Sequence, residues 1–235
     1  MSKIDQKAGN DKIHVVRSTS LAAAIDNMRP EKLKALLEEV RSGNLTVARA
    51  SEELTSVLRQ VPFEDLGFAK VDHHRAIRQG FPEVVFGTGK TAEQVATIAS
   101  TIVEAGHDLL VTRTDADAYA NVRTRVPDAV FHETARIISH APDRVPTGQG
   151  NILVVSGGTS DQPVAEEAVI SAQVMGNLVD RLYDVGVAGI HRLLAERTRL
   201  EQARVIIVVA GMDGALPSVI GGLVSRPVIA VPTSV

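Results

Sequence analysis

Cysteine and tryptophan are absent from the 235 residues of this chain, and aromatic residues make up only 3% of it. Without cysteine, the chain can form neither a disulfide framework nor a thiolate metal site. The scarcity of aromatic side chains argues against base-stacking platforms for single-stranded nucleic acid. The formal net charge of −3 provides no broad basic surface, so nucleic acid is not expected as a partner.

Long apolar runs are missing as well. The first seven residues (MSKIDQK) have no apolar signal-peptide core, and no run approaches the length of a transmembrane helix. We therefore expect a cytoplasmic protein that does not bind membranes. With 44% hydrophobic and 23% charged residues, the composition is that of an ordinary globular protein, and its length suits one large domain or two small ones.

Residues 1–60 are predicted to form a loose arm followed by a helical hairpin. Leucine and valine recur with a helical period after Pro30, and this pattern stops at Gly43. A second helical pattern begins near Thr46. Two short consecutive helices of this kind are typical of a packing or oligomerisation element.

Residues 61–140 are predicted to form a small α/β domain. Short apolar runs at 83–86, 108–111 and 129–131 alternate with helical patterns, as in a βαβ unit. Residues 141–150 contain two prolines and two glycines, a composition typical of a linker.

Residues 151–235 show the clearest alternation of strand and helix. The strands are continuous apolar runs, which indicates a parallel sheet covered on both faces. They are predicted at 152–156, 185–190, 204–210 and 227–231, with helices near 163–182, 192–202 and 215–224. Ligands bind beyond the carboxyl ends of such strands, so the loops that follow the four strands are candidate ligand-binding loops.

The first loop is Ser156-Gly157-Gly158-Thr159-Ser160-Asp161, and Pro163 follows in the first turn of the predicted helix. Adjacent glycines let the backbone approach a ligand closely, and the hydroxyls of Thr159 and Ser160 can donate hydrogen bonds. Free N–H groups at a helix N-terminus suit a phosphate. A plain strand-to-helix turn has the same pattern, so both interpretations stay open.

The other three loops offer charged and hydroxyl groups. Arg192 can clamp a phosphate or carboxylate, and His191 can move a proton or hold an anion. Asp213 lies between Gly211-Met212 and Gly214, where desolvation at the mouth of an apolar sheet can turn a carboxylate into a general base. A helix cap or turn is the simpler role for an aspartate there. The fourth loop, Pro232-Thr233-Ser234, adds hydroxyls.

Three other patterns do not carry the chemistry that they suggest. Residues 86–91 (FGTGKT) end like a phosphate-binding P-loop, but Val84 stands where that motif needs a glycine. Lys90 can still reach an anion. Asp72-His73-His74 lacks the ligand spacing of a zinc site, so no metal site is predicted. There is no Gly-x-Ser-x-Gly elbow, which argues against a serine hydrolase.

The loops of residues 151–235 together resemble the aminoimidazole ribonucleotide carboxylases. The matching stretches are 156–161 (SGGTSD), 188–192 (AGIHR), 210–217 (AGMDGALP) and 227–232 (PVIAVP). The resemblance implies an α/β flavodoxin-like fold of three layers with a parallel sheet, assembly as an octamer, and phosphate binding at the first loop.

One residue departs from the pattern of the purine carboxylases. They have a catalytic histidine directly before the Leu-Pro of the third loop, and here that residue is Ala215. A carboxylase that depends on this histidine as a proton shuttle could not work in the usual way.

A longer resemblance is to the LarB family, the pyridinium-3,5-biscarboxylic acid mononucleotide synthases that begin nickel-pincer cofactor synthesis. The shared stretches are 71–91 (VDHHRAIRQGFPEVVFGTGKT), 163–168 (PVAEEA) and 215–219 (ALPSV). With the loops described above, they extend the resemblance over residues 60–235.

This resemblance implies that nicotinic acid adenine dinucleotide is carboxylated at pyridinium C5 with CO2 or bicarbonate, and that its phosphoanhydride is hydrolysed to release AMP. In the family, a cysteine thiolate adds to the ring so that a ring carbon can attack CO2. An acidic residue then removes the C5 proton, and Asp213 is the catalytic residue expected here. No tightly bound cofactor is expected, and a pyrophosphate substrate is compatible with Mg²⁺.

The residues expected to bind the substrate lie in the strand-end loops and at one lysine. They are Ser156, Gly157, Gly158, Thr159, Ser160, Asp161, His191, Arg192, Gly211, Met212, Gly214, Ala215 and Lys90. The expected partners are the dinucleotide and further copies of the chain.

Two features depart from the LarB pattern. The family's acidic residue is usually glutamate, which is one methylene longer than Asp213. Its cysteine lies well beyond the third loop, past Val235, so we expect that a C-terminal segment is missing from this sequence. Two alternatives stay open: a purine-pathway carboxylase or mutase, which Ala215 disfavours, and a non-catalytic nucleotide-binding oligomer. Charged residues of 61–140, such as Asp72 and Arg78, can hold an adenylate or form solvated ion pairs.

Overall fold

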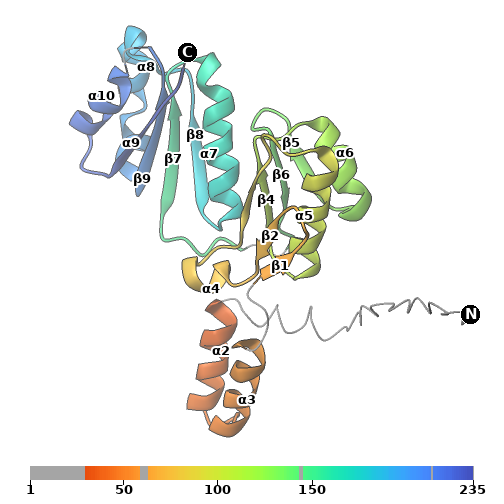
Figure 1. Ribbon diagram of the computed structural model, residues 1–235. Helices are drawn as coiled ribbons and strands as arrows, with labels where there is room; N and C mark the ends of the chain where they lie inside the picture. The colour runs from red at the N-terminus through yellow and green to blue at the C-terminus, as the bar shows by residue number, and fades with distance from the viewer. Residues whose placement is uncertain (1–29, 59–62, 143–144, 213, 235) are drawn as a thin grey trace, which may run out of the picture.

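The computed structural model describes residues 30–58, 63–142, 145–212 and 214–234. The predictions for the N-terminal arm and for Asp213 lie outside these residues. The described residues form a helical hairpin and two α/β lobes (Figure 1). None of their helices is both long and apolar enough to cross a membrane.

The hairpin consists of α2 (Pro30–Arg41) and α3 (Val47–Leu58), which confirms the predicted pair of helices. Proline suits the first turn of a helix because its missing N–H would have no partner there. After α2, Gly43 adopts a left-handed conformation with φ of 81°, and its N–H bonds the carbonyl of Val40. The hairpin projects away from the two lobes (Figure 1).

The N-terminal lobe (residues 63–142) contains a four-stranded mixed sheet with the order β3-β4-β6-β5. Its strands are β3 (Val84–Phe86), β4 (Leu109–Thr112), β5 (Val130–His132) and β6 (Ile137–His140). Its long helices are α5 (Ala92–Glu104) and α6 (Ala116–Arg125). Because β3 and β4 are parallel and joined through α5, the predicted βαβ unit is present.

Three strands of this lobe were not predicted from the sequence. One is β6, which pairs antiparallel with both β4 and β5. The other two form an antiparallel ribbon of β1 (Phe63–Asp65) and β2 (Lys70–Asp72), followed by the short helix α4 (Arg75–Gln79). The ribbon strands are short and carry charged residues, and β6 has only two apolar residues in a row, so these segments lack the longer apolar runs by which the other strands were found.

The C-terminal lobe (residues 151–234) contains a fully parallel sheet with the order β10-β9-β7-β8. The strands are β7 (Asn151–Ser156), β8 (Leu178–Leu182), β9 (Val205–Ala210) and β10 (Val228–Pro232). One face is covered by α7 (Gln162–Val174), and the other by α8 (Ile190–Ala195), α9 (Arg197–Gln202) and α10 (Ala215–Leu223), as Figure 1 shows. This is the expected flavodoxin-like arrangement of three layers.

The predicted helix over 163–182 is confirmed only as far as Val174, and the predicted strand over 185–190 is wrong. Helix α7 ends at Val174 because Gly176 takes a left-handed conformation with φ of 83°. Residues 178–182 then form β8, an edge strand whose Asp180 and Arg181 are exposed, so its sequence lacks a continuous apolar run. Residues 187–189 form a 3₁₀ turn rather than a strand.

The two lobes share an apolar core. Helix α7 lies between the two sheets (Figure 1), and its Val169 packs in one cluster with Leu110 and Ile137 of the N-terminal lobe. Val154 and Val209 of the C-terminal sheet belong to the same cluster. The carboxyl ends of β7, β8 and β9 lie at one edge of their sheet, where the candidate loops meet.

Candidate functional site

A cavity of about 470 Å³ lies at the carboxyl edge of the C-terminal sheet. Its volume is in the range of small-molecule sites. The loops that follow β7, β8 and β9 all contribute to it. The lining residues are Gly157, Gly158, Ser160, Asp161, Gly186, Val187, Ala188, Arg192, Ala210, Gly211, Met212 and Leu216.

The glycine loop after β7 is fixed by the carboxylate of Asp161, which is only 5% exposed. Its Oδ2 accepts a hydrogen bond from the Gly158 N–H at 2.9 Å, and its Oδ1 accepts one from the Thr233 hydroxyl at 2.7 Å. Both oxygens are thus used inside the protein. Asp161 holds the loop in shape rather than presenting a free carboxylate to a ligand.

The absence of side chains at two glycines lets the first two loops touch. A Cβ atom at Gly186 would lie 2.9 Å from the carbonyl oxygen of Gly157, closer than real atoms approach. A Cβ at Gly157 would lie 3.1 Å from Asp161 Oδ2. Glycine at both positions lets the backbone of the β7 loop line the cavity, while the N–H groups of Gly157 and Gly158 donate hydrogen bonds to Val209 and Asp161.

The remaining residues of the first loop lie in different environments. Ser160 is exposed and lines the cavity, whereas Thr159 is exposed but does not line it. Ser156 is fully buried, and its hydroxyl has no hydrogen-bond partner among the described residues. Because Ser156 does not line the cavity, the structure does not bring it to a ligand there.

Arg192 lies in the cavity wall, but it is reached through helix α8 rather than directly from a strand end. Its Nη1 lies 2.7 Å from Oδ2 of Asp184, which holds the guanidinium in place. Asp184 has a φ of 58°, a left-handed conformation that aspartate adopts more readily than most residues. The sequence analysis missed this partner of Arg192. His191 is exposed and does not line the cavity.

The third loop closes the cavity with apolar and backbone groups. Gly211 and Met212 line it, and Met212 is 98% exposed at its mouth. Gly214, with φ of 62°, is the N-terminal cap residue of α10, and Ala215 begins this helix without lining the cavity. Asp213, the expected catalytic residue, lies outside the described residues.

Lys90 lies in the loop after β3 of the N-terminal lobe and lines a different cavity. The structure therefore does not bring it to the glycine loop. In the same lobe, Arg78 forms an ion pair with Asp72. For these residues the sequence left open either an ion pair or contact with an adenylate. Hydrogen bonding to Arg78 lowers the pKa of Asp72 from its usual value, against the raising effect of burial.

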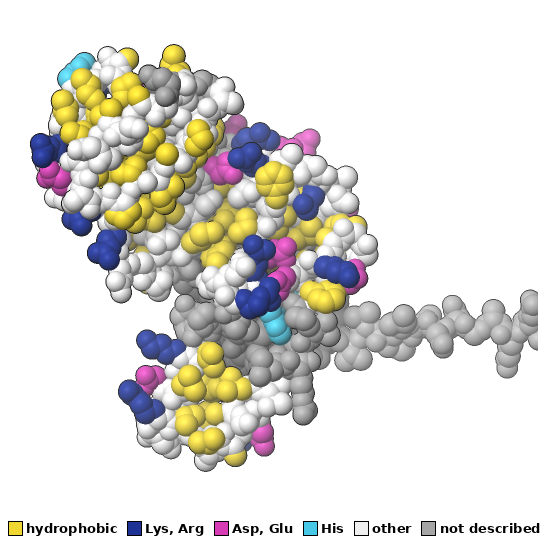
Figure 2. Space-filling model, turned by 60° about the vertical axis from the view of Figure 1, so that its left-hand side comes forward, with side chains coloured by type: hydrophobic (Ala, Val, Ile, Leu, Met, Phe, Trp, Pro, Cys, Tyr) yellow, Lys and Arg dark blue, Asp and Glu magenta, His cyan; other side chains and the backbone are white. Residues whose placement is uncertain are grey.

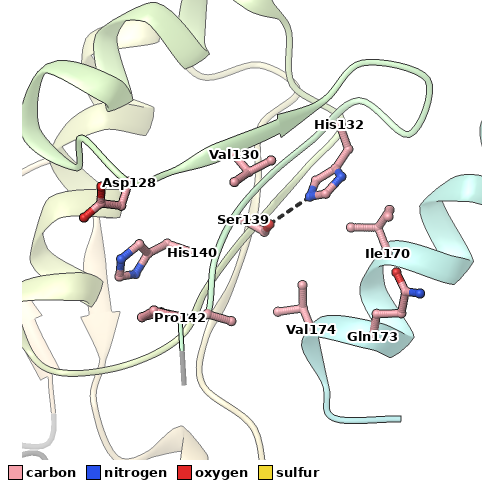
Figure 3. A pocket seen from close by; sticks show the side chains of 10 residues that line it. Asp128, Val130, His132, Ser139, His140, Pro142, Ile170, Gln173 and Val174 are labelled. Atoms are coloured by element: carbon pink, nitrogen blue, oxygen red, sulfur yellow. Dashed lines mark hydrogen bonds between the residues drawn. The ribbon is translucent and has the colours of Figure 1, made fainter. Parts of the chain in front are cut away.

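A second polar region lies between the lobes, where the sequence indicated nothing. A cavity of about 340 Å³ there is lined by β5, β6 and α7, and Figure 3 shows His132 beside Ser139, with Ile170 and Gln173 of α7 opposite. His132 Nε2 lies 2.9 Å from the Ser139 hydroxyl. Burial lowers the pKa of His132 from its usual value.

Beside this cavity, Arg181 and Tyr183 converge on the carboxylate of Glu166. Arg181 donates from Nε at 2.8 Å and from Nη2 at 3.1 Å, and the Tyr183 hydroxyl donates at 2.7 Å. Burial raises the pKa of Glu166, but these hydrogen bonds outweigh it, so the pKa is lowered overall. Burial, together with the bond to Glu166, raises the pKa of Tyr183. The ion pair of Glu166 with Arg181 joins α7 to β8.

The parallel flavodoxin-like sheet, with a cavity at its carboxyl edge lined by the glycine loop and an arginine, is the arrangement of an α/β protein of the PurE-like class. A family model described as AIR carboxylase matches residues 151–235, and one described as LarB/PurE-like N-terminal domain matches residues 63–142. Among curated proteins, the chain is 34% identical over 213 residues to "Uncharacterized protein MJ0165" of Methanocaldococcus jannaschii, covering 87% of this chain and 82% of the relative. The chain belongs to the LarB family.

A more limited similarity is to the N5-carboxyaminoimidazole ribonucleotide mutase of the same organism. The identity is 38% over 84 residues, which is 34% of this chain and 51% of the mutase. The family therefore places the chain among the PurE- and LarB-like carboxylases. In the described residues, no group of three or more histidine, aspartate or glutamate side chains could hold a metal ion.

Proposed function

We propose that this protein acts on nicotinic acid adenine dinucleotide, carboxylating pyridinium C5 and hydrolysing the phosphoanhydride to release AMP. The observation that carries the proposal is the cavity in which the Gly157–Gly158 backbone, Arg192 and the loop of Met212 meet. The helix N-terminus that follows these glycines and one arginine suit a phosphate, while the Val187 and Leu216 side chains offer an apolar wall to a flat ring.

The carboxylation needs a nucleophile and a base. A thiolate adds to the pyridinium ring, C5 of the resulting enamine attacks CO2, Asp213 accepts the C5 proton, and expulsion of the thiolate restores the aromatic ring. The 235 residues contain no cysteine, so the thiolate is not among them. A water molecule attacks the phosphoanhydride, and AMP leaves. Mg²⁺ beside the pyrophosphate would assist that departure.

The proposal also includes assembly into a homo-oligomer, namely an octamer. Several large hydrophobic side chains of the C-terminal lobe are exposed, among them Ile190, Leu194 and Ile229, and Figure 2 shows hydrophobic side chains gathered on this lobe and on the hairpin. Extended exposed apolar surface is typical of protein–protein contacts. Light scattering of the purified chain tests the octamer, and a monomer at micromolar concentration would contradict it.

The substrate is tested by titrating the protein with nicotinic acid adenine dinucleotide in a calorimeter, followed by mass spectrometry after incubation with bicarbonate. We expect the dinucleotide to bind, and this cysteine-free chain to form no dicarboxylated mononucleotide. Absence of binding would overturn the proposed substrate. Carboxylation by the cysteine-free chain would overturn the thiolate step.

One observation supports a second candidate function, the carboxylase or mutase reaction on aminoimidazole ribonucleotides. It is the similarity of 84 residues of this chain to the mutase from Methanocaldococcus jannaschii. Ala215 stands against it, because it leaves no histidine before the Leu-Pro of the third loop. Tighter binding of an aminoimidazole ribonucleotide than of the dinucleotide in the same titration would favour this alternative.

A further inference from the structure

The N-terminal lobe has its own cavity at the carboxyl edge of its two parallel strands, β3 and β4. Its volume is about 410 Å³, enough for part of a small-molecule ligand. It is lined by Gly87, Thr88, Gly89, Lys90, Ala92, Val95, Arg113, Thr114, Asp115, Asp117, Ala118 and Arg136. None of these residues lines the cavity in the C-terminal lobe.

Two helices begin at this cavity. Residues from the first turn of both α5 and α6 lie in its wall, so the positive ends of two helix dipoles face the same space. The caps bind some of the N–H groups at these helix ends: Thr91 accepts from the Gln94 N–H at 3.2 Å, and Asp115 accepts from the Ala118 N–H at 2.9 Å.

Three cationic side chains line the cavity, against two carboxylates. Lys90 Nζ donates to the Phe86 carbonyl at 2.8 Å, and Arg136 Nε donates to the Thr114 carbonyl at 3.2 Å. Each of these bonds uses one donor of a group that carries several. Arg113, the third cation, is paired with Glu167 at 3.4 Å, so the remaining N–H groups of Lys90 and Arg136 are the ones that favour an anionic ligand.

Thr114 provides an observation independent of the helix ends. It is 4% exposed and lines the cavity, and its Oγ1 has no hydrogen-bond partner among the described residues. A buried hydroxyl without a partner is unfavourable, so such groups usually mark a missing ligand or water. A Cβ at Gly87 would lie 3.0 Å from the carbonyl oxygens of Thr112 and Arg113, so the loops after β3 and β4 pack closely against each other at this cavity.

We propose that this cavity binds the phosphate group of a nucleoside monophosphate. The phosphate accepts hydrogen bonds from the Thr114 hydroxyl, Lys90 and Arg136, and it faces the N-termini of α5 and α6. The remaining volume holds the sugar. This site is separate from the cavity in the C-terminal lobe, and the proposal that it binds a phosphate does not depend on the reaction proposed for that cavity.

Titrations with inorganic phosphate and with AMP test the site. We expect Thr114→Val to weaken phosphate binding about tenfold, because one hydrogen bond to a charged group is lost. Lys90→Met should weaken it further. The matched controls are Thr124→Val, on the exposed face of α6, and Lys70→Met, an exposed lysine of β2; both should bind as the parent does.

Thr114→Val keeps the shape of the side chain and removes an unpaired buried hydroxyl, so it should fold at least as stably as the parent. Arg192→Ala removes a cation from the other cavity and should leave the Thr114-dependent binding intact. Phosphate binding that survives both Thr114→Val and Lys90→Met would overturn the site, as would the absence of phosphate and AMP binding in the parent. AMP binding without phosphate binding would overturn the assignment to the phosphate group.

Discussion

The hydroxyl of Thr233 donates a hydrogen bond of 2.7 Å to the buried carboxylate of Asp161, 72 residues earlier in the chain. The bond ties the segment that follows β10 to the glycine loop that follows β7, on opposite sides of β9 in the sheet. Since Asp161 also accepts the Gly158 N–H, one carboxylate sets the shape of the loop and its distance from the sheet edge.

Asp161→Ala is therefore expected to loosen the glycine loop. It removes the acceptor of two hydrogen bonds in a buried place, which should lower the free energy of unfolding by about 1–3 kcal/mol. Dinucleotide affinity should fall as well, because the glycine loop that lines the cavity is no longer held in its shape. Urea unfolding and calorimetric titration measure the two effects.

Thr233→Val provides the matched test, since it removes only one of the two bonds and keeps the side-chain shape. Its effect on stability should be smaller than that of Asp161→Ala. The exposed Glu52→Gln on α3 is the control for loss of a carboxylate, and it should change neither quantity. Full dinucleotide affinity in Asp161→Ala would contradict the positioning role.

Arg192→Ala should weaken binding of nicotinic acid adenine dinucleotide about 10- to 100-fold, the effect of losing a charged hydrogen bond to a phosphate. Stability should change little, because the pair with Asp184 is partly exposed. Arg197→Ala is the control: this arginine lies on the neighbouring helix α9 and pairs with Glu201 away from the cavity. Equal affinities of the two variants would show that Arg192 does not bind the substrate.

Much of the C-terminal sheet was predictable because buried parallel strands such as β7 and β9 are unbroken apolar runs. The edge strand β8 was not, since an edge strand needs apolar residues only where it meets the core. Its Asp180 and Arg181 are exposed and resemble the polar positions of a helix. That one error placed His191 and Arg192 at a strand end, whereas they begin a helix after a 3₁₀ turn.

The contacts that shape the site were harder to predict than the loops that form it. The loop at Gly157 was recognisable from its glycines, but nothing in the sequence pairs Asp161 with Thr233 or Arg192 with Asp184, because these contacts depend on how separate loops meet. Lys90 was assigned to the substrate from its residue type. The structure places it in the other lobe, since β3 belongs to a different sheet.

The lowered pKa of His132 predicts a loss of stability in mild acid. Burial is the main cause, the negative charge of Glu166 opposes it, and Arg181 adds to it. The folded state then holds fewer protons on this side chain than the unfolded state, so stability is fully present above the usual pKa of 6.5 and falls as the pH drops below it. His132→Asn should flatten this decline between pH 7 and pH 5, as measured by urea midpoints.

The exposed His191 supplies the control for this experiment, because His191→Asn should leave the slope of stability against pH unchanged. Asparagine at position 132 can still bond the Ser139 hydroxyl, so stability at pH 8 should stay close to that of the parent. An identical slope in His132→Asn and the parent would mean that other groups cause the acid sensitivity.

The core shared by the lobes predicts that they unfold together. Ile137 is fully buried in the cluster that α7 forms with both sheets. Ile137→Ala should lower the free energy of unfolding by about 2–5 kcal/mol through lost burial and a residual cavity. Because the cluster joins the lobes, the loss should shift one common transition, seen equally by probes placed in each lobe. Leu37→Ala on the exposed face of α2 should have little effect. Two separate transitions, with only the N-terminal one shifted, would show that the lobes are energetically independent.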